Sequence, residues 1–103
     1  MRMTLAERVR SAVATLMHAT GESQTDLATA LGVSQAQVSR RQAGSAAWSL
    51  EDCEAVAAHF GIDVLDLMAG PTQASEALPD ARRRAAGRRV SGAGPVAQGE
   101  AAR

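Results

Sequence analysis

Apolar residues recur at three- and four-residue steps through the first seventy positions, a spacing typical of amphipathic helices. Each run follows a Ser, Thr or Asp with an acidic residue or glutamine three positions later, the pattern of a helix start. These pairs are Thr4–Glu7, Ser23–Asp26, Ser34–Gln37, Ser49–Asp52 and Asp63–Asp66. The predicted helices cover about residues 5–19, 24–31, 35–42, 50–60 and 64–69. The pattern therefore predicts an all-α fold, a compact bundle of five helices.

The same spacing assigns an inner face to each longer helix. In the first helix this face comprises Leu5, Val9, Val13, Leu16 and Met17, and in the fourth Leu50, Cys53, Val56, Ala57 and Phe60. Leu65 and Met68 are expected to point inward from the fifth helix.

The composition changes after Gly70 and Pro71. Residues 71–103 are rich in Ala, Gly and Arg, and their larger apolar side chains are Leu78, Val90 and Val96. Such a segment cannot build a second core. The chain is therefore expected to divide into a folded domain, 1–70, and a flexible tail, 71–103, with a short extra helix near Pro79 as an alternative.

Residues 24–44 carry the clearest functional pattern. Leu27 and Leu31 lie on one helical face, and Gly32 follows directly, where a helix ending needs a left-handed residue. Ser34 then caps a new helix in which Val38 is the one large apolar side chain. Two short helices joined by a tight turn, the second with a polar face, are typical of a helix-turn-helix that presents one helix to the DNA major groove.

Several residues of this region resemble the helix-turn-helix of the lambda-repressor-like family, the Cro and phage-repressor group of bacterial regulators. They are Gln24, Leu27-Ala28, Leu31-Gly32-Val33-Ser34, Val38-Ser39-Arg40 and Gly44. Residues 48–62 resemble the fourth helix of that family and the entry into the fifth. The resemblance implies a lambda-repressor-like bundle that binds operator DNA, with Gln24 and Gln35 touching each other while contacting phosphate and base.

The candidate DNA-binding residues lie on the second and third predicted helices and in the loop that follows. They are Gln24, Ser34, Gln35, Ala36, Gln37, Ser39, Arg40, Arg41 and Ser45. Glutamine can bond adenine through both amide groups, and arginine can donate two bonds to guanine or hold a phosphate. Arg41 departs from the family pattern, which usually has an apolar residue there. Each of these side chains has an alternative role as an ordinary solvated residue.

Charge divides unevenly along the chain. Residues 1–70 hold five arginines against eight carboxylates, a net charge of −3, and residues 71–103 hold six arginines against three, a net charge of +3. An acidic domain has little non-specific affinity for DNA, since that affinity comes from neutralised phosphates. A basic cluster in the tail is a second candidate for DNA contact, with a solvated tail as the equal alternative. The cluster comprises Arg82, Arg83, Arg84, Arg88 and Arg89.

Other chemistries have little support. Cys53 is the single cysteine, the two histidines are isolated, and no Cys-x-x-Cys occurs, so neither a disulfide nor a metal site is expected. No nucleophile–base pairing or glycine-rich phosphate loop indicates an enzyme or a cofactor. No apolar run could cross a membrane and no signal peptide is evident, so a cytoplasmic protein is expected.

The sequence thus favours a sequence-specific repressor of transcription that occupies double-stranded operator DNA, similar to a small phage immunity repressor or a Cro-like regulator. One alternative is an antitoxin or another protein-interaction module that uses the tail. Another is a restriction-modification controller or activator. A homodimer on DNA, through Leu65, Leu67 and Met68, and a monomer on an asymmetric site both remain open.

Overall fold

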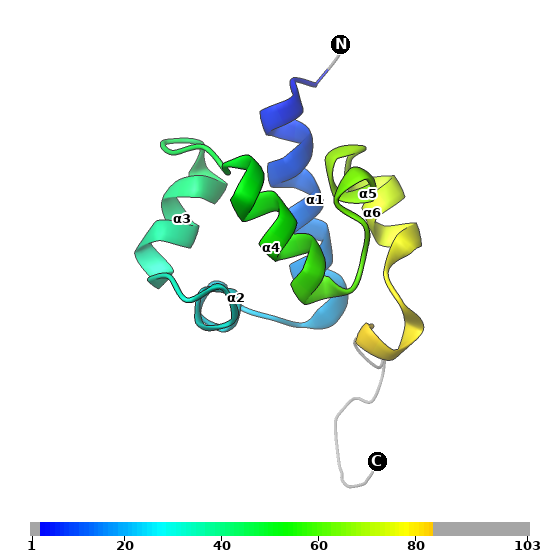
Figure 1. Ribbon diagram of the computed structural model, residues 1–103. Helices are drawn as coiled ribbons and strands as arrows, with labels where there is room; N and C mark the ends of the chain where they lie inside the picture. Colours follow the sequence, from blue (N-terminus) through cyan, green and yellow to red (C-terminus); the bar gives the residue numbers. More distant parts are fainter. Residues whose placement is uncertain (1–2, 84–103) are drawn as a thin grey trace, which may run out of the picture.

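This computed structural model describes residues 3–83 of the chain. They form six α-helices and one short 3-10 helix, joined by short loops. They are α1 (Leu5–Thr20), α2 (Gln24–Leu31), α3 (Gln35–Ala43), α4 (Leu50–Phe60), α5 (Val64–Met68), α6 (Pro71–Ala77) and η1 (Asp80–Arg82). The helix α1 stands in the middle of the molecule, with α2 and α3 on one side and α5 and α6 on the other (Figure 1). The predicted all-α class is confirmed, with no strand among the described residues.

Four of the five predicted start signals form capping boxes. In α1 to α4 the Ser or Thr hydroxyl accepts from the backbone N–H three residues on, and the side chain there accepts from the N-cap N–H. In α5, Asp63 instead caps alone, accepting from the N–H of Leu65 at 2.8 Å. The carboxylate of Asp66 accepts from Gln73 of α6 at 3.0 Å, so the expected Asp63–Asp66 box was wrong.

One apolar core joins all six helices. Its largest fully buried side chains are Phe60, Leu16, Leu27, Leu67, Val13, Val38 and Val56. The prediction that three leucines point into the core was wrong, because Leu5, Leu50 and Leu65 are 51%, 70% and 72% exposed. Leu5 and Leu50 are the first residues of their helices and lie beyond the packed core. On α5, residues 65 and 67 point in nearly opposite directions, so burying Leu67 turns Leu65 outward.

The segment that follows Gly70 was expected to be a tail, but as far as Arg83 it belongs to the packed body. Pro71 occupies the first turn of α6, where its missing N–H costs nothing. The helix α6 packs more extensively on α1 than any other helix does, and it buries Ala74 and Leu78. Small alanine side chains let the two helices approach closely, a contribution that a search for large apolar residues overlooks. The expected count of five helices was therefore too low.

Candidate nucleic-acid interface

The predicted helix–turn–helix segment is built from local signals. Gly32 ends α2 in the left-handed conformation, with φ of 73°, and its N–H donates to backbone carbonyls of the last turn. Two residues later the hydroxyl of Ser34 caps α3. The helix α3 packs against α2 and buries only Val38 completely. The exposed part of its surface, which includes Gln35, Ala36 and Arg40, is therefore available for contacts outside the protein.

The first residues of α2 and α3 meet through their side chains. Gln35 Nε2 donates to Gln24 Oε1 at 2.7 Å. The contact between the two glutamines is thus present in the folded chain. Each carboxamide has two donor hydrogens and a carbonyl oxygen, so the pair retains the Gln35 carbonyl and further N–H groups for another partner. The bond joins the two helix starts and leaves the remaining amide groups free to bond to another molecule.

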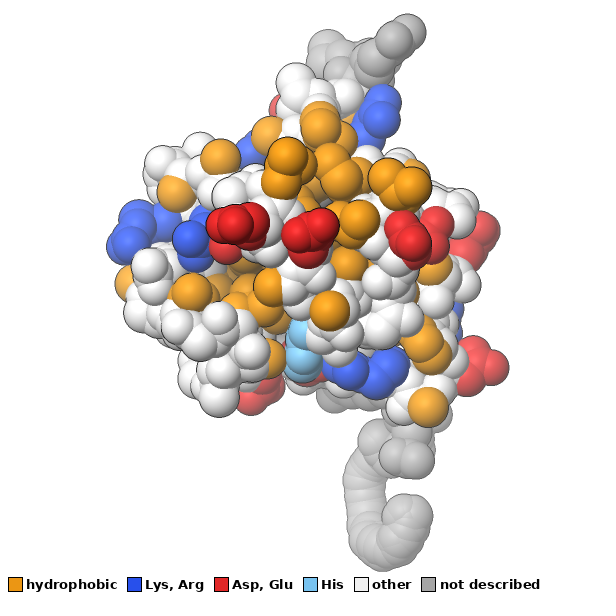
Figure 2. Space-filling view, viewed as in Figure 1, with side chains coloured by type: hydrophobic (Ala, Val, Ile, Leu, Met, Phe, Trp, Pro, Cys, Tyr) orange, Lys and Arg blue, Asp and Glu red, His pale blue; other side chains and the backbone are white. Residues whose placement is uncertain are grey.

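The exposed face of α3 holds a short row of candidate residues. Gln35, Ala36 and Arg40 are exposed, and Ser39 is half-buried. Within residues 3–83, no ion pair or hydrogen bond involves the Arg40 guanidinium. In Figure 2 arginine side chains mark the edge of the molecule that α3 forms in Figure 1. Donors and a methyl group in this arrangement match what the edges of base pairs offer in the major groove.

Three other predicted site residues hold the ends of α3 in place. Ser34 and Gln37 form the capping box, in which Gln37 Oε1 accepts from the Ser34 N–H at 2.8 Å. Ser45 Oγ donates to the carbonyl of Arg40 at 3.2 Å. The Ser34 hydroxyl and the Gln37 amide nitrogen can still donate outward, whereas the single O–H of Ser45 is used in its bond to Arg40.

Arg41 does not lie with the exposed candidates. Its Nε is 3.2 Å from Asp52 Oδ2 on α4, and its guanidinium carbon lies 5.5 Å from the centre of the Trp48 ring. The carboxylate and the aromatic face draw the side chain toward the body of the protein, because both attract a cation. In the folded chain Arg41 thus faces α4 and lies apart from the exposed row of α3, and its contact with DNA stays a prediction.

Gln42 and Arg10 contact the end of α3, and the sequence pattern did not predict either contact. Gln42 Nε2 donates to the carbonyl of Arg10 in α1 at 3.1 Å, and Gln42 Oε1 accepts from Trp48 Nε1 at 2.8 Å. The Arg10 guanidinium lies beside Gly44, at the end of α3. Since Gln42 follows Val38 by four residues, helical spacing alone would have placed it toward the body. No sequence signal indicated Arg10.

Two of the five tail arginines make contacts inside the protein. Arg82 Nη2 donates to Glu22 Oε2 at 2.9 Å, and Arg82 Nη1 donates to the carbonyl of His59. Arg83 donates to the carbonyl of Ser75. The Arg82 guanidinium is thus bound to the α1–α2 loop and α4 in the folded chain, and its contact with DNA stays a prediction. Arg84, Arg88 and Arg89 lie outside the described residues.

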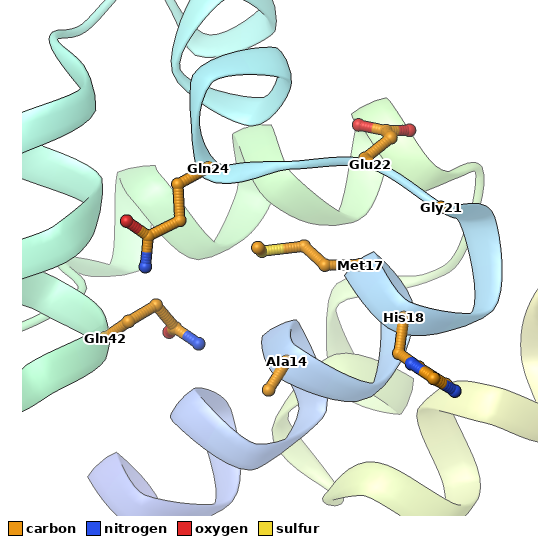
Figure 3. A pocket seen from close by; sticks show the side chains of 7 residues that line it. All are labelled: Ala14, Met17, His18, Gly21, Glu22, Gln24 and Gln42. Carbon is orange, nitrogen blue, oxygen red and sulfur yellow. The ribbon is translucent and has the colours of Figure 1, made fainter.

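An open hollow borders the start of α2. It is lined by Ala14, Met17, His18, Gly21, Glu22, Gln24 and Gln42. Figure 3 shows the side chains of Gln24 and Gln42 on one side of it, across from Ala14 and Met17 of α1. Polar and apolar groups thus both line the hollow.

One ionised group lies close to the paired glutamines. Hydrogen bonds from the backbone and hydroxyl of Ser23 lower the pKa of Asp26 below its ordinary value of 3.8. Asp26 therefore remains a carboxylate at the positive end of α2.

Among residues 3–83, no group of three or more His, Cys, Asp and Glu side chains is arranged to hold a metal ion. In the same range, no helix has the length and apolar character to cross a membrane.

Residues 3–83 thus form a small all-helical domain whose α3 carries a polar, donor-rich face. The chain belongs to the BetR domain family, whose match covers residues 1–96. No curated protein and no solved structure matches the chain.

Proposed function

We propose that the protein is a sequence-specific transcriptional repressor that binds double-stranded DNA through α3. The observation that carries this proposal is the Gln24–Gln35 bond at 2.7 Å, which holds two helix starts together beside the exposed Arg40. Membership of the BetR domain family supports a DNA-binding regulatory role. The lambda-repressor-like arrangement and a role in phage immunity are finer parts of the same proposal.

The mechanism is occupancy of an operator. The start of α3 enters the major groove, where Gln35 and Arg40 donate to base edges, while the start of α2 and the loop at Ser45 lie near the sugar-phosphate backbone. Bound protein then excludes polymerase from an overlapping promoter. No bond is made or broken, so the protein is not proposed to be an enzyme.

Selection from a random DNA pool, followed by titration of the recovered site, tests this function. The variant Gln35→Ala with Arg40→Ala removes two exposed α3 side chains without touching Val38. We expect the double variant to fold and to lose about 100-fold or more in preference for the selected site, because each good base contact contributes about 1–3 kcal/mol of discrimination. The matched control, Gln73→Ala with Arg83→Ala, makes the same two changes away from α3. Unchanged preference in a folded Gln35/Arg40 variant would refute the proposal.

We further propose that the protein binds DNA as a homodimer. Apolar side chains gather over the starts of α1 and α4 and over α5 (Figure 2), and Leu50 and Leu65 are the most exposed large apolar residues described. A two-fold dimer would place half-sites about one helical turn apart. The symmetry of the selected DNA site and the sedimentation of Leu65→Glu test this. A monomer on an asymmetric site would contradict the dimer and leave the role of α3 intact.

A further inference from the structure

The attachment of α3 to the rest of the protein is unusually small for a helix that must be held accurately. Val38 is the one fully buried side chain in the nine residues of this helix. One buried side chain near the middle of a helix does not by itself fix the direction of the helix axis. The contacts at its two ends therefore decide its direction.

The end nearest α2 is joined to that helix by Gln35 bonding to Gln24. The other end depends on Gln42. Its amide nitrogen donates to a backbone carbonyl of α1 at 3.1 Å, and its carbonyl oxygen accepts from the Trp48 indole at 2.8 Å. One half-buried carboxamide thus joins α3 to both α1 and the loop that leads to α4.

Trp48 is held by two consecutive residues of α3. Its N–H bonds to Gln42, and its ring face carries the Arg41 guanidinium, which also pairs with Asp52. The Gln42 bond is the more directional of the two contacts, because hydrogen bonds weaken steeply away from linearity whereas contact with a ring face tolerates displacement. Gln42 therefore sets the direction of α3, and Arg41 adds to its attachment.

We propose that Gln42 is a positioning residue for base discrimination: it orients α3 about Val38 so that Ser39 and Arg40 meet the base edges, without itself touching DNA. This inference rests on the proposed function of α3. Discrimination by Arg40 is sensitive to such orientation, because a bidentate contact needs both donors within hydrogen-bond distance of one base.

The test compares Gln42→Met with Gln73→Met in the full chain. Both substitutions remove a carboxamide and keep the length of the side chain, but Gln73 lies on α6 and bonds to Asp66 on α5, away from α3. For Gln42→Met we expect discrimination between the selected site and a site changed at the Arg40 base pair to fall about tenfold. Non-specific affinity and the slope of affinity against salt should stay unchanged, because the phosphate contacts remain. Gln73→Met should match the parent protein.

A second measurement needs no DNA. Residual dipolar couplings of backbone amides give the orientation of α3 relative to α1 and α4 in each folded variant. We expect a changed orientation in Gln42→Met and in Trp48→Phe, which removes the indole donor, but not in Gln73→Met. An unchanged orientation of α3 in Gln42→Met overturns the positioning role even if the parent protein selects no DNA site. Absence of site selection by the parent protein overturns the proposed function instead.

Discussion

Arg82 Nη2 donates to Glu22 Oε2 at 2.9 Å, which joins η1 to the loop between α1 and α2. The other carboxylate oxygen of Glu22 lies 2.7 Å from His59 Nε2, and Arg82 also donates to the backbone carbonyl of His59. One partly buried carboxylate therefore connects three segments that are far apart in the sequence. Glu22 precedes the first residue of α2 by two positions, so this connection supports the element that presents Gln24.

The Glu22–Arg82 pair is expected to contribute measurably to stability. Arg82→Met removes the guanidinium and leaves Glu22 partly buried with one partner fewer, which should lower the free energy of unfolding by about 1–2 kcal/mol. Arg83→Met is the matched control, since its carboxylate partner Asp80 is fully exposed, and it should change stability by less than about 0.5 kcal/mol. Chemical denaturation followed by circular dichroism measures both. Equal losses in the two variants would show that the bond to Glu22 is not stabilising.

The docking of α6 on α1 is expected to be essential for folding. Leu78→Ala removes a buried side chain at the end of α6 and should lower the free energy of unfolding by about 2–4 kcal/mol. Leu65→Ala makes the same change at an exposed position and, at a protein concentration where the chain is monomeric, should have an effect within about 0.5 kcal/mol. Thermal melts of the two variants check this difference. A small effect of Leu78→Ala would mean that residues after Gly70 are dispensable for the core.

Gly44 is constrained by backbone conformation and by a neighbour. Its φ is +88°, and an added Cβ would lie 3.3 Å from Arg10 Cζ. Gly32 has a similar φ of +73° with nothing within 4 Å of that Cβ position. Both Gly→Ala variants should lose about 1–2 kcal/mol to left-handed strain. Only Gly44→Ala should also displace Arg10. A crystal structure or the chemical shift of Arg10 Nε distinguishes them, and an undisturbed Arg10 in Gly44→Ala would contradict the crowding.

Acid should weaken the start of α2 through Asp26. The pKa of this carboxyl is lowered in the folded protein by its bonds to Ser23, so its contribution to stability is fully present above pH 3.8 and is lost as the pH falls through the lowered value. Asp26→Asn should therefore show a smaller loss of stability between about pH 4 and pH 2 than the parent protein. Glu54→Gln removes an exposed carboxylate outside the caps and is the charge-matched control. Identical pH dependence in Asp26→Asn and the parent would contradict this role.

The helices of this protein were largely predictable because their ends are specified locally. Ser or Thr caps, partners three residues later and terminating glycines act within a few residues, and all four predicted boxes that begin with Ser or Thr form. Burial at helix starts was less predictable. Leu50 continues the apolar stripe of α4 but lies 70% exposed, since a stripe does not show where the neighbouring helices end.

The candidate site was predictable where its geometry is local and not where it depends on tertiary contacts. The pairing of Gln24 with Gln35 joins the starts of adjacent helices, and it was predicted from the resemblance. The inward position of Arg41 depends on Asp52 and Trp48, which approach only when α4 packs. The two hydrogen bonds of Gln42 require a backbone carbonyl of α1 as well as the Trp48 indole. No pattern along the chain specifies these distances.

The nine residues of α3 divide two tasks between different positions. Val38, Arg41 and Gln42 attach the helix to the body, whereas Gln35, Ala36 and Arg40 are exposed. Substitutions at the exposed positions alter the outer chemistry at little thermodynamic cost, because surface changes usually shift stability by less than about 0.5 kcal/mol. Under the proposed function, such a helix can acquire new target preferences by a few amino-acid replacements, and the same scaffold is a suitable starting point for engineered recognition.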